Sequence, residues 1–228
     1  METFKEVKRK FKAGISEILK KTNNAELDEA AFPAYAHKNP FIDYLFWKRL
    51  RLAFRFAQKY STGQRVLDFG CGSGVMSYLL AKNNFEVWAS DLEFSPLRMI
   101  SSGIDFPPNI RFIEGDIMSK SLESNSFDIV FALDVLEHIE NYPDYVRLFN
   151  RLLRDRGIAV ISGPSENWLY RIGRKIAGKR FTGDYHVINI AAINESFKEG
   201  YEIICLKKLV FPFVLFEIFV ARKIETPS

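Results

Sequence analysis

The sequence has little cysteine and no long hydrophobic run. Its 228 residues include two cysteines, Cys71 and Cys205, which lie far apart and suggest neither a disulfide framework nor a metal site. The longest apolar stretch is broken by Pro212 and followed by Glu217, well short of the roughly 20 residues that a membrane-spanning helix needs. The N-terminus carries no apolar core flanked by basic residues, so we predict a cytoplasmic protein without a targeting segment.

The net charge is also small, and its distribution along the chain is uneven. The formal charge is +4, and the first 60 residues hold 13 lysines and arginines against 7 acidic residues. Aromatic residues are frequent, since 9 of the 29 residues from 32 to 60 are Phe, Tyr or Trp. A charge of +4 identifies no partner by itself, and the aromatic segment is expected to pack on a core or to shape an apolar ligand site.

From Arg65 onward, short apolar runs alternate with helical patterns. Strands are expected at 65–70, 86–90, 111–115, 127–133 and 157–163, with helices at 75–82, at 96–101 with Ser95 as cap, and at 142–153. Such alternation predicts crossover connections and a parallel sheet. The last two runs, 201–209 and 215–223, are close enough to form an antiparallel hairpin that completes the sheet.

The segment before Arg65 is expected to be helical. Residues 41–60 place Phe46, Leu50, Phe54 and Ala57 on one face, and a second stripe carries Lys48, Arg51, Arg55 and Lys59. We predict an N-terminal helical cap over residues 1–62 and one domain over 63–228. A lid insertion at about 164–196 is too long for a simple loop.

The motif VLDFGCGSG, residues 66–74, indicates a ligand loop. The strand ends at Phe69, and the glycines that follow permit a tight turn and close approach of the backbone to a ligand. Asp91 ends the next strand, where an acidic side chain can accept hydrogen bonds from both hydroxyls of a ribose. Asp116 follows the third strand at the same rim. The alternatives are a purely structural turn, a helix cap at Asp91 and a turn residue at Asp116.

Two details distinguish this loop from a dinucleotide-binding one. The nicotinamide fingerprint needs a glycine where this chain has Val75. A carboxylate at Asp68 would repel a pyrophosphate, but it would suit a ligand with an ammonium group. Both details favour S-adenosylmethionine, whose amino-acid end is cationic.

With these motifs the chain resembles a class I S-adenosylmethionine-dependent methyltransferase, of the broad group that includes small-molecule and quinone-biosynthesis methyltransferases. VLDFGCGSG, VWASDLEFSP, FIEGDI and FDIVFALDVLEHI carry the resemblance, over about residues 65–223. It implies an α/β fold with a Rossmann-like parallel sheet of about seven strands, an antiparallel last strand and helices on both faces. It also implies S-adenosyl-L-methionine as cofactor, with S-adenosyl-L-homocysteine as product. The cofactor residues that it implies are Asp68, Gly70, Cys71, Gly72 and Gly74 at the methionine part, Asp91 at the ribose, Leu92, Asp116 and Ile117 at the adenine, and Leu133 with Asp134 near the sulfonium.

The expected reaction is in-line transfer of the methyl group to an acceptor oxygen or nitrogen, which would also need to lose a proton to a general base. His186 and His138 are the candidate bases, with His37 as a third and packing as the alternative role for each, and Asp134 completes the candidate catalytic set. We exclude Cys71 as a nucleophile, because methyl transfer needs no covalent intermediate. The residues after the fourth strand lack the N-P-P-Y pattern of methyltransferases that act on nucleobase amino groups.

The insertion contains a basic amphipathic stretch, WLYRIGRKIAGKRF, in which Arg171, Arg174 and Lys175 are the candidate substrate-binding residues. They favour a small-molecule or lipid-like acceptor with a negative group, or a peripheral contact with an anionic membrane, over a nucleic acid. A solvated lid is the simpler explanation of the same pattern. The alternative functions are RNA methylation and a non-catalytic cofactor-binding protein that acts in regulation or assembly. The sequence leaves the oligomeric state open.

Overall fold

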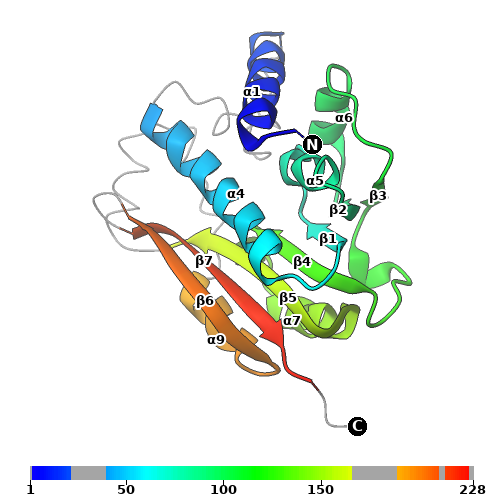
Figure 1. Ribbon diagram of the computed structural model, residues 1–228, viewed down its shortest axis with the longest axis vertical. Helices are drawn as coiled ribbons and strands as arrows, with labels where there is room; N and C mark the ends of the chain where they lie inside the picture. The colour runs from blue at the N-terminus through cyan, green and yellow to red at the C-terminus, as the bar shows by residue number, and fades with distance from the viewer. Residues whose placement is uncertain (1, 22–39, 166–188, 211–213, 226–228) are drawn as a thin grey trace. The chain divides into compact units, whose positions relative to one another are not determined.

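The structure is a computed structural model that describes residues 2–21, 40–165, 189–210 and 214–225. They form two compact units, one of residues 1–55 and 64–117 and the other of residues 56–63 and 118–228. The strands follow the order β3-β2-β1-β4-β5-β7-β6, and β7 is antiparallel to its neighbours (Figure 1). This topology confirms the predicted Rossmann-like sheet of seven strands. The division into a cap over 1–62 and a domain from 63 stays a prediction.

The first unit contains three parallel strands, the helix α5 that packs on them, and the helix α1 that packs on α5 and α6. Its strands pair in register, so that Phe69 at the end of β1 lies beside Ser90, and Asp91 at the end of β2 lies beside Glu114. The carboxyl ends of neighbouring strands therefore meet at one edge. The elements are α1 (Phe4–Lys21), most of α4 (Pro40–Tyr60), β1 (Arg65–Phe69), α5 (Val75–Ala81), β2 (Glu86–Asp91), α6 (Ser95–Ser101) and β3 (Ile110–Glu114).

Helix α4 has the two faces that its sequence predicts. It begins at Pro40, and Leu50, Phe54 and Ala57 are buried while Phe46 is partly buried. The basic residues of the second stripe are all exposed. In α1, Val7, Phe11 and Ile15 recur every four residues and are fully buried, which fixes that helix by one apolar stripe.

The prediction that Ser95 caps α6 is wrong. The helix begins at Ser95 itself, and the capping position is Phe94, which makes no side-chain cap hydrogen bond. The Phe94 ring is buried and packs edge-on against Phe112, and its backbone N–H donates to Glu114 at 3.1 Å. Ring burial and that one hydrogen bond fix this turn, so a capping hydroxyl is not needed.

The second unit contains the remaining four strands. Strand β4 is buried from Phe127 to Ala132, as its continuous apolar run predicts, and β6 with β7 forms the predicted antiparallel hairpin. Helices α7 and α9 contact each other, both contact β5, and α9 also contacts β6 and β7. The elements are β4 (Phe127–Leu133), the short helix η2 (Leu136–His138), α7 (Tyr142–Leu152), β5 (Leu153–Pro164), α9 (Ile190–Phe197), β6 (Tyr201–Val210) and β7 (Val214–Lys223). The short helix η1 (Ile117–Ser119) lies where the two units join along the chain.

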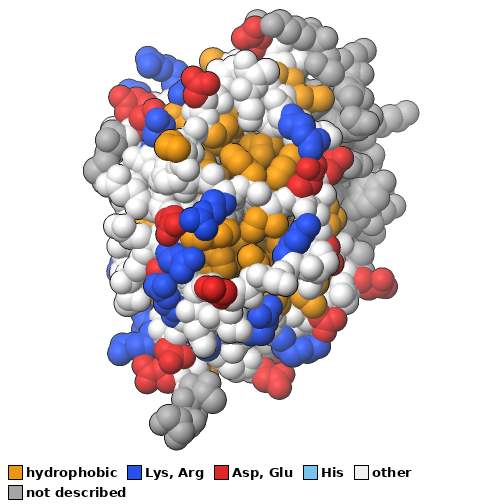
Figure 2. Space-filling view, turned by 90° about the vertical axis from the view of Figure 1, so that its right-hand side faces the viewer, with side chains coloured by type: hydrophobic (Ala, Val, Ile, Leu, Met, Phe, Trp, Pro, Cys, Tyr) orange, Lys and Arg blue, Asp and Glu red, His pale blue; other side chains and the backbone are white. Residues whose placement is uncertain are grey.

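The described surface mixes charges of both signs. On the face in Figure 2, apolar side chains gather in patches with basic and acidic side chains around them. No helix in the described parts of the chain is long and apolar enough to cross a bilayer.

Candidate functional site

The glycine loop turns sharply between β1 and α5. The backbone N–H groups of Gly70 and Cys71 both donate to the Ser90 carbonyl, at 2.8 and 3.0 Å, and Gly74 donates to the Cys71 carbonyl at 2.8 Å. The φ angles of Gly70, Gly72 and Gly74 are 72°, 52° and 73°, in the left-handed region that side chains with a β-carbon rarely adopt. The three glycines are therefore required by the path of the backbone.

Two of these glycines differ in what surrounds them. A β-carbon at Gly74 would lie 2.8 Å from Phe106 and 2.9 Å from Leu97, so this glycine permits packing inside the unit. A β-carbon at Gly72 would meet no protein atom within 4 Å. Space for a ligand to approach the backbone is therefore present at Gly72.

Asp91 is tied to the same loop. Its carboxylate accepts a hydrogen bond from the Gly72 N–H at 2.7 Å through one oxygen and from the Leu92 N–H at 2.8 Å through the other. Burial raises the pKa of Asp91, and the two N–H donors oppose that shift. Each oxygen keeps a second lone pair, so the carboxylate can also accept hydrogen bonds from two hydroxyls.

Asp68 lies in β1 and is almost fully buried, with 3% of its surface exposed. The Ser77 hydroxyl donates to it at 2.5 Å. Burial raises the pKa of Asp68 to about 6, the Ser77 hydroxyl opposes the shift, and the nearby charge of Asp91 adds to it. Two neighbouring carboxylates, both costly to ionise, would gain from a cationic ligand. These acceptors fit the ammonium end of S-adenosylmethionine, which donates hydrogen bonds and carries positive charge.

The other predicted residues of this unit have distinct surroundings. Leu92 is 72% exposed, and Ile117 is buried beside the exposed Asp116. Cys71 is partly exposed, and burial raises the pKa of its thiol well above the usual value, with the charges of Asp68 and Asp91 adding to the shift. A thiol that resists ionisation is a poor nucleophile, in agreement with its exclusion above.

The predicted residues of the second unit lie just after β4. Leu133 is the last residue of that strand, and Asp134 has φ 58°, a left-handed conformation that is unusual for a residue other than glycine. Asp134 is held by Ser162, whose carbonyl accepts from the Asp134 N–H at 2.9 Å and whose hydroxyl donates to the Asp134 carboxylate at 2.8 Å. His138 is exposed in η2. The remaining predicted residues, His37, Arg171, Arg174, Lys175 and His186, lie outside the described residues.

Sequence reasoning missed the two serines that hold these carboxylates. Ser77 follows the loop in the segment VMSYLLA, where a serine among apolar residues is the only signal. Ser162 lies inside the apolar strand β5 and gives no signal of its own.

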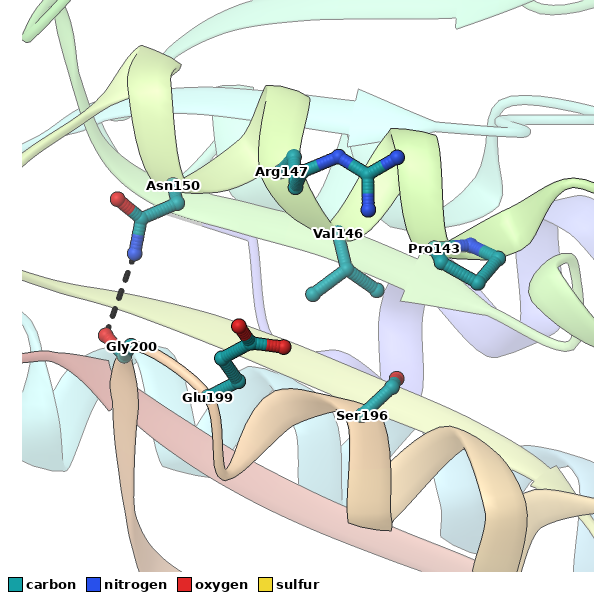
Figure 3. Close-up of a pocket in the computed structure, with 7 residues that line it drawn as sticks. All are labelled: Pro143, Val146, Arg147, Asn150, Ser196, Glu199 and Gly200. Carbon is teal, nitrogen blue, oxygen red and sulfur yellow. Dashed lines mark hydrogen bonds between the residues drawn. The ribbon is translucent and has the colours of Figure 1, made fainter.

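A separate hollow of about 320 Å³ lies between α7 and α9. Its lining comes from α7, from α9 and from the turn that follows α9, and the Asn150 amide donates to the Gly200 carbonyl at 3.2 Å across it (Figure 3). None of the predicted site residues in the described part of the chain lines it. The lining residues are Pro143, Val146, Arg147, Asn150, Ser196, Glu199 and Gly200.

The chain resembles several methyltransferases over part of its length. It is 27% identical over 115 residues to the mitochondrial ubiquinone biosynthesis O-methyltransferase of Schizosaccharomyces pombe, covering 49% of this chain and 42% of that protein. It is 32% identical over 104 residues to phosphoethanolamine N-methyltransferase 1 of Arabidopsis thaliana, covering 44% and 21%. The matches thus span less than half of either relative.

Whole-fold similarity extends further than sequence similarity. The structure of the PH0226 protein from Pyrococcus horikoshii aligns with a TM-score of 0.67 and 20% identity, over 84% of this chain and 95% of that one. A family model described as a methyltransferase domain matches residues 35–206, which is most of the chain and includes the glycine loop, Asp68 and Asp91. The chain therefore belongs to this family of methyltransferase domains.

Proposed function

We propose that the protein transfers a methyl group from S-adenosyl-L-methionine to a small-molecule acceptor. The observation that carries the proposal is the pair of carboxylates, the buried Asp68 and the partly buried Asp91, beside a loop that is open at Gly72. In this proposal Asp68 and the loop hold the cationic methionine part, and Asp91 accepts hydrogen bonds from the ribose hydroxyls. Leu92, Asp116 and Ile117 flank the adenine. When bound, the cofactor supplies a methyl group that its sulfonium has already activated.

The protein's task in this reaction is mainly to position the acceptor. Correct positioning can supply up to ~7–11 kcal/mol of the barrier. We assign to Asp134, which is held by Ser162 of β5, the role of orienting the acceptor or taking its proton. His138 and His186 are the candidate histidine bases.

The finer part of the proposal concerns the acceptor. We infer an apolar or lipid-linked molecule with a negative group, held by Arg171, Arg174 and Lys175. The same residues would favour peripheral contact with an anionic membrane. The support is the basic and apolar composition of residues 168–181, which contain five basic side chains and no acidic one.

Two other functions are less well supported. The curated relatives reported above are named for methyl transfer in ubiquinone biosynthesis and to phosphoethanolamine, which favours a small molecule over RNA. A non-catalytic protein would bind the cofactor without consuming it. Incubation of the protein with labelled cofactor and cell extract, followed by separation into lipid, small-molecule, protein and RNA fractions, tests all three. Label in the small-molecule or lipid fraction is the expected result, and label only in RNA, or in no fraction, contradicts the proposal.

A further inference from the structure

The hydroxyl of Ser77 lies inside the protein beside the glycine loop. Ser77 is fully buried in the first turn of α5, three residues after Gly74. Every other side chain of this helix is apolar or aromatic, so Ser77 does not belong to a solvent-facing polar side of the helix. It donates to Asp68 at 2.5 Å.

We propose that Ser77 is a positioning residue of the cofactor site, whose hydroxyl keeps the buried Asp68 carboxylate ionised and fixes its orientation. The inference rests on the proposed function, in which Asp68 receives the ammonium group of S-adenosylmethionine. It assigns a role to Ser77 in addition to Asp68. Without a buried hydrogen-bond donor, the Asp68 carboxyl would be protonated more readily and would bind a cation less well.

The surroundings of Asp68 explain why such a donor is needed. Among the described residues, the titratable groups that face it are Asp91 on β2 and Cys71 in the loop, and neither supplies positive charge. Burial raises the pKa of Asp68, and the Ser77 hydroxyl is the strongest influence in the opposite direction, with the Ser77 backbone N–H helping. A hydroxyl that donates to a carboxylate stabilises its charged form. Removal of the hydroxyl alone should therefore raise the pKa of Asp68 further.

The competing explanation is that Ser77 only fills space in the core of the unit. The two explanations differ in pH dependence. A positioning role through the charge of Asp68 makes the loss of cofactor affinity larger in mild acid, where the carboxylate of the variant is protonated. A role in packing alone gives a loss that does not change with pH.

The test is calorimetric titration of S-adenosylmethionine into the full chain between about pH 6 and pH 8.5. Ser77→Ala should raise the Kd by roughly 3- to 10-fold at neutral pH, more at the acid end and less at the alkaline end. In an Asp68→Asn background the same substitution should change the Kd by less than about twofold, because residues that act through one another are not additive. Ser126→Ala is the control, since it also removes a buried hydroxyl that donates at 2.7 Å, but to the Glu123 carbonyl in the other unit.

Each outcome separates the inference from the proposed function. A wild-type chain that does not bind the cofactor overturns the proposed function, and the inference fails with it. If the wild type binds the cofactor, either of two results overturns the inference and leaves the proposed function standing. One is a Ser77→Ala penalty in Kd that is independent of pH, and the other is a penalty that is equal in the wild-type and Asp68→Asn backgrounds. Ser77→Cys has nearly the size of serine and a weaker donor, so it carries the test where Ser77→Ala does not fold. An intermediate, pH-dependent loss supports the inference, and wild-type affinity at all pH values overturns it.

Discussion

At the scale of single residues, the ionised Asp68 should lower the stability of the fold while it strengthens cofactor binding. Its pKa is raised to about 6 in the fold from an ordinary 3.8, so the folded protein prefers the neutral carboxyl and loses stability as pH rises between these values. Asp68→Asn should therefore raise the free energy of unfolding at neutral pH by up to about 3 kcal/mol. The gain should vanish below about pH 3, where the carboxyl is protonated in both the folded and the unfolded state.

The same variant should weaken cofactor binding, because the amide cannot attract a cation. Thermal unfolding at the two pH values and calorimetry at neutral pH check both effects. A variant that is less stable than the wild type at neutral pH would contradict the reasoning, since it would mean that the ionised carboxylate stabilises the fold.

Gly72 and Gly74 give a matched pair of substitutions within one loop. Both have positive φ, so alanine at either position costs about 1–2 kcal/mol in backbone strain. Gly74→Ala should cost roughly 1–3 kcal/mol more, because its β-carbon would collide with Phe106 and Leu97. Gly72→Ala should remain folded and lose cofactor affinity by at least about tenfold, since its methyl group enters the space expected for the ligand.

Unfolding midpoints and calorimetry separate the two variants. If a folded Gly72→Ala protein keeps the wild-type affinity for the cofactor, the cofactor does not bind against this loop. Equal stability of the two alanine variants would show instead that the side chains around Gly74 can move to accept a β-carbon at little cost in stability.

The sequence predicted the carboxylates and glycines of the site better than their supporting residues. Asp68 lies one residue before the end of β1 and Asp91 ends the neighbouring β2, so parallel pairing of the two strands places both carboxylates near the same edge of the sheet. The partners Ser77 and Ser162 are small polar residues inside apolar segments. Only the fold reveals that their hydroxyls point at Asp68 and Asp134.

At the scale of elements, α1 is joined to the glycine loop through a chain of aromatic rings. The fully buried Phe11 lies edge-on to Tyr78 of α5 at 5.2 Å and to Phe106 at 6.2 Å between ring centroids. Phe106 is also the side chain that leaves no room for a β-carbon at Gly74. Disturbance of α1 should therefore reach the cofactor loop.

Phe11→Ala should lower the free energy of unfolding by about 3–5 kcal/mol, the range for removal of a buried aromatic ring. It should also raise the Kd for the cofactor. Lys5→Ala, on the exposed face of the same helix, is the control and should stay within about 0.5 kcal/mol of the wild type. Denaturant unfolding and calorimetry measure both quantities, and unchanged affinity in a destabilised Phe11→Ala protein would show that the rings do not transmit the disturbance.

The elements themselves were largely predictable because strands and helices have different hydrophobic periods. The five expected parallel strands and the C-terminal hairpin are all present. Periodicity does not give element ends, which depend on tertiary contacts. Strand β5 begins at Leu153 rather than 157, because Leu153 pairs with Phe127 across a register shift. The start of α6 was missed because the Phe94 ring, and no hydroxyl, fixes that turn.

At the scale of the whole molecule, two sets of basic residues are candidates for the surface that binds an anionic partner. Arg171, Arg174 and Lys175 are candidates from the sequence alone, and they lie outside the described residues. The exposed stripe of α4, with Lys48, Arg51 and Arg55, is the natural comparison. Both sets contain three basic residues, so reversal of either set to glutamate changes the net charge equally. A difference between the two variants therefore reports on location and not on total charge.

If the insertion carries the contact, the first triple reversal should abolish sedimentation with vesicles of phosphatidylcholine and phosphatidylserine, because each basic residue near such a surface contributes about 1 kcal/mol. The α4 reversal should weaken it much less, and added salt should release the wild type, since exposed charges are screened beyond ~8–10 Å. Equal losses of vesicle binding in both variants would show that only the net charge of the protein matters, and not the location of the basic residues. A wild-type protein that ignores these vesicles at low salt contradicts membrane contact. The insertion would then act on a soluble anionic acceptor, and the first triple variant should raise KM for that acceptor with cofactor affinity unchanged.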